Sequence, residues 1–173
     1  GTSITRNSIG ARPDGWLIPN SNGVLIDTGA YSNTIGDGSA GRLNVIGGNN
    51  NNGIRIGGWS TLSNSIRLND IGLSSALPAA PLAPGAPTAR LASKPSAPLL
   101  RALANGGYGV LLDAGSRNTL TTDGNWIGNN QAGGIGIYGD ASHNTVGPGE
   151  SIFENAGSGI EFSGAGTAWN TVY

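Results

Sequence analysis

The chain has 173 residues, a net charge of −1, no cysteine and 31 glycines. The near-neutral charge provides no basic field for nucleic acid or anionic lipid, and the lack of cysteine excludes disulfides and thiolate metal sites. Neither a signal peptide nor an apolar span of about 18 residues is visible. Frequent glycine and asparagine between short runs of Val, Ile and Leu are typical of many short strands joined by tight turns.

The chain opens within a repeating pattern. Ile4 and Ile9 have the same spacing as a later pair, Ile66 and Ile71, so we expect residues 1–10 to form the latter part of a coil. No capping segment is visible there, although an exposed end of stacked strands invites edge pairing. We therefore expect that the native chain starts further upstream.

After a predicted loop over residues 12–22, one motif recurs five times. It consists of a glycine, a short alternating apolar strand, a turn of small residues, and then an asparagine, a hydroxyl residue and a branched or apolar residue. The leading glycines are Gly23, Gly53, Gly109, Gly134 and Gly159, with gaps of 30, 56, 25 and 25 residues. A period of about 25 residues, with a third strand centred on an isoleucine such as Ile71 or Ile127, predicts a three-sided coil. The chain is therefore predicted to be an all-β, parallel β-helix with three strands per coil and about five coils.

One position of the motif is always asparagine. The five residues are Asn33, Asn64, Asn118, Asn144 and Asn170. Asparagine tolerates the left-handed backbone of a tight corner and can satisfy N–H groups that the corner leaves unpaired. We predict that these side chains stack as an asparagine ladder and have a structural role.

The 56-residue gap contains an excursion, residues 73–107, with six of the nine prolines and no strand signal. Its closely spaced prolines favour an extended, polyproline-like path. A short helix is predicted near residues 97–104, with Ser96 as its cap and Asn105 at its end. The chain is thus predicted to be a single solenoid segment, residues 1–173, with one long inserted loop.

The outward side chains of the first strand of each coil form the most plausible ligand-binding face, because strand side chains alternate between core and solvent. The candidates on or directly after these strands are Leu25, Asp27, Arg55, Leu111, Asp113, Tyr138 and Glu161. Leu25 and Leu111 are apolar side chains on a solvent face and need a cover or a partner. We hypothesise that the excursion folds back over this face and buries both leucines.

Acid–base catalysis needs carboxylates that converge within one or two coils. Asp27 and Asp113 share a repeat position but lie two coils apart, about 10 Å by the spacing of stacked strands. The alignment places Asp113 beside Tyr138 and therefore predicts no carboxylate pair. Asp113, Tyr138 and Glu161 remain the weak candidates for catalysis.

No metal site and no cofactor are predicted. His143 is the only histidine and lies in a turn directly before an asparagine, which is typical of a solvated side chain. Calcium bound by carboxylates is the alternative, although the chain has no D-x-D-x-D run.

The runs N-G-V-L-I-D-T-G-A-x-x-N-T-I-G, N-V-I-G-G-N and N-G-G-Y-G-V-L-L-D-A-G resemble repeats of bacterial right-handed parallel β-helix proteins. These belong to the pectate-lyase-like group of carbohydrate-binding proteins and sugar hydrolases, and the resemblance is strongest to large secreted or surface proteins. It covers the chain except for about residues 74–103 and implies the fold more strongly than an activity. The G-H-G and R-I-K motifs of polygalacturonases, the D-P-H-D of alginate epimerases and the aspartate cluster of pectate lyases are missing.

The sequence therefore favours a non-catalytic scaffold that is secreted or located at the cell surface and binds a saccharide or a protein partner. A fragment of a polysaccharide lyase or glycoside hydrolase is the first alternative. A self-associating module, forming a homo-oligomer through uncapped ends, is the second. No nucleic acid partner and no membrane insertion are expected.

Overall fold

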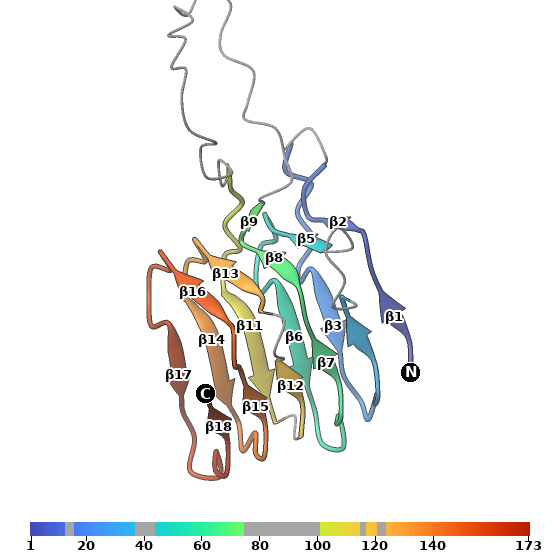
Figure 1. Ribbon diagram of the computed structural model, residues 1–173, viewed down its shortest axis with the longest axis vertical. Coiled ribbons are helices and arrows are strands. Elements are labelled where there is room, and N and C mark those ends of the chain that lie inside the picture. The colour runs from blue at the N-terminus through green and yellow to red at the C-terminus, as the bar shows by residue number, and fades with distance from the viewer. Residues whose placement is uncertain (13–15, 37–43, 75–100, 115–116, 121–123) are drawn as a thin grey trace, which may run out of the picture.

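The computed structural model describes residues 1–12, 16–36, 44–74, 101–114, 117–120 and 124–173. Within these ranges the chain forms eighteen short strands and no helix. Successive strands turn from one sheet to the next, so that each coil lies against the following one and three parallel sheets result (Figure 1). The fold is a parallel β-helix, as the repeat predicts.

Each sheet is built from strands that have the same place in the repeat, and we name the sheets by that place. The first-strand sheet contains β3 (Val24–Ile26), β6 (Ile54–Gly57), β11 (Tyr108–Asp113), β14 (Gly133–Tyr138) and β17 (Ile160–Phe162). The second-strand sheet contains β1 (Ser3–Ile4), β4 (Thr34–Ile35), β7 (Ser65–Ile66), β12 (Thr119–Leu120), β15 (Thr145–Val146) and β18 (Thr171–Val172). The third-strand sheet contains β2 (Ser8–Ile9), β5 (Asn44–Ile46), β8 (Asn69–Ile71), β13 (Trp126–Gly128) and β16 (Ser151–Phe153).

The core is a narrow column of branched aliphatic side chains, one or two from each strand. In the first-strand sheet the residues that alternate with the outer face, from Val24 in β3 to Ile137 in β14, are buried. Ile160 packs against the same cluster, but Phe162 in β17 is 48% exposed. β17 is the last strand of its sheet and has a neighbour on one side only.

In the described part of the chain, three long asparagine ladders run along the solenoid, whereas sequence reasoning found only one. In each, the side-chain oxygen of an asparagine accepts hydrogen bonds from the side-chain amide and, at most steps, the backbone N–H of its counterpart in the preceding coil. The predicted ladder joins Asn33, Asn64, Asn118, Asn144 and Asn170. The second joins Asn7, Asn44, Asn69 and Asn125 and ends at Glu150, and the third joins Asn20, Asn49, Asn105, Asn130 and Asn155.

The left-handed backbone conformation at the predicted ladder falls on the residue before each asparagine and not on the asparagine itself. This position is occupied by Ser32, Ser63, Arg117, His143 and Trp169, with φ between 54° and 57°. The asparagine is required for its amide, which satisfies the N–H groups of the corner.

The two ends of the excursion pair with each other. β9 (Leu73–Ser74) and β10 (Arg101–Ala102) form an antiparallel pair in which Ser74 lies opposite Arg101. The prediction of a helix near residues 97–104 is therefore wrong where the structure describes it, because residues 101–102 form a strand of this pair. Residues 97–100 lie outside the described part.

The described ends of the excursion pack against the third-strand sheet. Leu103 is buried with Val45, and its backbone exchanges hydrogen bonds with Gly48 and Gly72. They leave Leu25 in the first-strand sheet 49% exposed. The hypothesis that the excursion buries Leu25 and Leu111 therefore finds no support in the described residues, and residues 75–100 lie outside them.

Candidate ligand-binding face

The outer face of the first-strand sheet has the register that the repeats predict. Leu25, Arg55, Leu111, Gly136 and Glu161 lie opposite one another on five successive strands. Two residues further along, Asp113 lies between Gly57 and Tyr138. The candidates from these strands therefore share one surface of the solenoid.

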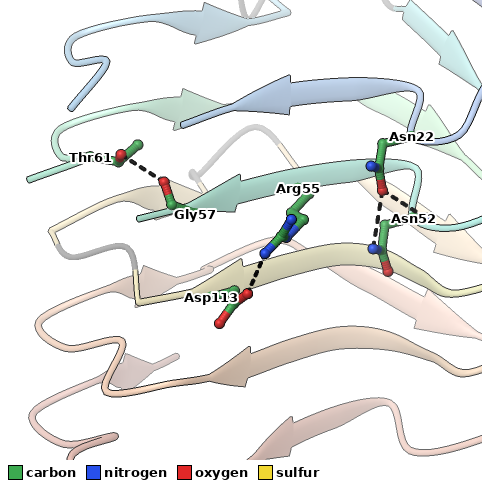
Figure 2. A network of polar contacts seen from close by, with 6 residues as sticks. All are labelled: Asn22, Asn52, Arg55, Gly57, Thr61 and Asp113. Atoms are coloured by element: carbon green, nitrogen blue, oxygen red, sulfur yellow. Dashed lines mark hydrogen bonds and ion pairs between the residues drawn. The ribbon is translucent and has the colours of Figure 1, made fainter. Parts of the chain in front are cut away.

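An ion pair links two neighbouring strands on this face. The guanidinium of Arg55 in β6 lies 2.5 Å from the carboxylate of Asp113 in β11, and the two side chains are 40% and 35% exposed (Figure 2). Arg55 lies opposite Leu111, so the contact is diagonal, which a long side chain can reach. Gly57 lies directly opposite Asp113, and a Cβ there would lie 3.7 Å from the guanidinium, which is an ordinary contact, so the ion pair does not depend on this glycine. Sequence reasoning compared only direct neighbours and missed the pair.

A cluster of two tyrosines and one carboxylate lies beside the ion pair. The rings of Tyr108 and Tyr138 meet edge to face with centroids 5.6 Å apart, and their hydroxyl oxygens are 2.5 Å apart. The hydroxyl of Tyr108 donates a hydrogen bond of 2.8 Å to the carboxylate of Glu161. Three coils thus contribute to one polar network.

Two glycines of β14 make room for this cluster. A Cβ at Gly133 would lie 2.7 Å from the ring of Tyr108, and a Cβ at Gly136 would lie 2.8 Å from the ring of Tyr138. Real Cβ atoms do not approach so closely. The two rings can therefore occupy these positions only because residues 133 and 136 are glycines. The two rings lie against bare backbone, which lets Tyr108 reach across β14 to Glu161.

The network sets the protonation of its members. Hydrogen bonds from Tyr138 and Tyr108 hold the pKa of Glu161 below its usual value, because they stabilise the carboxylate. Burial raises the pKa of Tyr138 and of Tyr108, and the carboxylate of Glu161 raises both further. Near neutral pH the face therefore presents an ionised Glu161 and two protonated phenols. This is unfavourable for Glu161 as a general acid and for Tyr138 as a phenolate base.

An open hollow of about 420 Å³ lies next to the cluster. Its lining consists of Asn22, Asn51, Asn52, Arg55, Gly107, Tyr108, Leu111, Asp113 and Ala132. Asn52 donates from its backbone and its side chain to the side-chain oxygen of Asn22, both at 3.2 Å (Figure 2), and accepts a hydrogen bond of 2.9 Å from the backbone N–H of Tyr108. The hollow therefore combines an aromatic side chain with amides and an ion pair.

Some of the predicted candidates lie at the hollow and others do not. Arg55, Leu111 and Asp113 line the hollow, and Tyr138 and Glu161 adjoin it through Tyr108. The exposed side chains of Leu25 and Asp27 belong to the same sheet but are not among the lining residues. Sequence reasoning missed Tyr108 and the asparagines. Tyr108 directly precedes a repeat glycine, at the position of Asn22 and Asn52, and that alignment was the available signal.

A second hollow of about 360 Å³ lies beside the start of the chain and includes Ser8, Arg12 and Asn20 in its lining. Most of its remaining lining is isoleucine, glycine and alanine. The described residues of its lining include no aromatic ring and no carboxylate, so the first-strand face is the better candidate for recognition.

His143, the one histidine, packs against an aromatic side chain. Its ring stacks on that of Trp169 with centroids 6.4 Å apart, at the corner that precedes the asparagine ladder. Among the described residues, no three histidine or carboxylate side chains are grouped so that they could hold a metal ion.

The fold places this chain in the class of parallel β-helix proteins. No family model, curated protein or solved structure matches it in the comparisons. The described residues include no helix that is long and apolar enough to cross a membrane. The class therefore rests on the stacked parallel sheets and the asparagine ladders.

Proposed function

We propose that this protein is a non-catalytic β-helix scaffold, secreted or located at the cell surface, that binds a saccharide on the outer face of its first-strand sheet. The observation that carries the proposal is the hollow in which Tyr108, the Arg55–Asp113 pair and two stacked asparagines converge. The resemblance of the repeats to those of secreted β-helix proteins supports the location.

The chemistry of the hollow suits a sugar ring. Sugars present hydroxyl groups that donate and accept hydrogen bonds, and faces of C–H groups that pack on an aromatic side chain. Tyr108 supplies the aromatic side chain, while planar amide, guanidinium and carboxylate groups can hold pairs of neighbouring hydroxyls. An open hollow of this size suits one or two sugar units better than an enclosed small molecule.

The protonation of the face supports binding rather than catalysis. Glu161 is held ionised by two phenols, and Asp113 is engaged by Arg55. Neither carboxyl is placed as a protonated acid opposite a free base, which glycoside hydrolysis requires.

The test is a glycan array on the purified chain, followed by turnover assays on every bound glycan. We expect binding without turnover. The Tyr108→Ala variant should lose most of the binding, while the control variant Tyr31→Ala, at an exposed tyrosine outside the hollow, should keep it. Circular dichroism checks that both variants fold. Turnover would favour a lyase or hydrolase instead, and no bound glycan would contradict the proposal.

A further inference from the structure

We infer that the hollow prefers neutral sugars and discriminates against sugars that carry carboxylate or sulfate groups. This inference rests on the proposed saccharide-binding function and names the class of ligand for the same face.

Arg55 is the only positively charged side chain among the described residues that line the hollow. It already contacts the carboxylate of Asp113 at 2.5 Å. An anionic sugar could use this guanidinium only by displacing Asp113 or by sharing it, and either arrangement leaves two negative charges close together.

Two carboxylates carry negative charge at or beside the hollow. Asp113 lines the hollow. The carboxylate of Glu161 accepts a hydrogen bond from Tyr108, which also lines the hollow. The two phenols that hydrogen-bond Glu161 keep it ionised. Arg55, Asp113 and Glu161 together carry one positive and two negative charges, so the face repels anions.

A neutral sugar can still form hydrogen bonds with the ion pair and with the amides of the hollow. A guanidinium has five N–H donors, and the contact with Asp113 uses the terminal nitrogen on one side. A sugar hydroxyl can accept from Arg55 and donate to Asp113 at once, which leaves the ion pair intact. The asparagine amides around the hollow offer donors and acceptors without charge.

The test compares sugars that differ only in charge. Oligomers of galacturonate, mannuronate and glucuronate are each paired with their carboxyl-reduced, neutral forms, and affinities are measured by calorimetry in low salt. We expect the neutral member of a bound pair to bind at least about tenfold more tightly, and this preference to shrink at 0.5 M NaCl because salt screens the repulsion.

Two variants locate the effect. Asp113→Asn removes one negative charge and frees Arg55 with little change of shape, so the preference should fall or reverse. Asp27→Asn makes the same charge change outside the hollow and should leave the preference as it was. Thermal unfolding checks that both variants remain folded. An unchanged preference in a folded Asp113→Asn variant would show that the ion pair is not the selector and would overturn the inference.

The outcomes separate the inference from the function on which it rests. Equal or tighter binding of the acidic members would overturn the preference for neutral sugars but leave saccharide binding in place. Binding of neither member, in these pairs and on the array, would overturn both.

Discussion

The hydroxyl of Tyr108 in β11 donates a hydrogen bond of 2.8 Å to the carboxylate of Glu161 in β17, across the intervening strand β14. The contact exists because Gly133 and Gly136 leave β14 without side chains beneath the rings. It joins three coils on the face where the candidate ligand site lies.

The Tyr108→Phe variant should raise the pKa of Glu161 toward its ordinary value. The variant keeps the ring but removes one of the two phenols whose hydrogen bonds favour the carboxylate. An NMR titration of the glutamate carboxyl carbons measures the change, and Tyr31→Phe is the control. An unchanged pKa would mean that Tyr138 alone stabilises the carboxylate.

The Gly136→Ala variant should displace the tyrosine cluster. Its Cβ would lie 2.8 Å from the ring of Tyr138 and 3.1 Å from the side chain of Leu111, so we expect a loss of about 1 to 3 kcal/mol in the free energy of unfolding. The near-ultraviolet circular dichroism of the tyrosines should change too. In Gly159→Ala the nearest atom lies at 3.6 Å, an ordinary contact, so this control should cost little. Equal effects of the two variants would contradict the proposed packing.

The Asn118→Ala variant should be strongly destabilising. It removes the acceptor of two hydrogen bonds from Asn64, both 3.0 Å and both buried, and leaves these donors unpaired. We expect a cost of about 2 to 4 kcal/mol in urea unfolding. Asn33→Ala, at a half-buried position where the side-chain oxygen accepts from Thr2, should cost clearly less. Similar costs would show that the ladder does not gain strength from burial.

Glu150 should make stability depend on pH, because burial raises its pKa from 4.5 to about 7 against two opposing hydrogen bonds from Asn125. Between these values the folded chain binds more protons than the unfolded chain, so the contribution of Glu150 is fully present below pH 4.5 and is lost as the pH rises through 7. Glu150→Gln removes this dependence. The free energy of unfolding of the unmodified chain should therefore fall relative to that of the variant by about 3 kcal/mol from pH 4.5 to 8.

Thermal and urea unfolding at each pH measure this difference. Glu154→Gln, at an exposed glutamate in the same coil, is the control and should show no such trend relative to the unmodified chain. A constant difference between Glu150→Gln and the unmodified chain would contradict the elevated pKa.

The coils were predictable because every repeat places its apolar side chains in the core at the same positions. The glycine before each first strand fixes the register, and alternation then assigns Arg55 and Leu111 to the outer face and Ile54 and Val110 to the core. The same alignment contained the second ladder. Glu150 replaces asparagine at the last position of this ladder, which makes its repeat less regular than that of the predicted ladder.

The contacts within the candidate site were harder to predict because they are diagonal. Arg55 reaches Asp113 past its direct neighbour Leu111, and Tyr108 reaches past β14 to Glu161. Strand pairing specifies which backbones are adjacent. Side-chain length and the absence of a Cβ on the strand between decide which groups meet.

The three ladders also determine how the molecule responds to force. Their hydrogen bonds, like those of the three sheets, connect one coil to the next and therefore point along the solenoid. A pull along this direction stretches the bonds on all sides of a coil boundary together, whereas a sideways pull on one edge can open them in sequence. We therefore expect the solenoid to resist tension between its two ends more strongly than a force that peels strands away from one face.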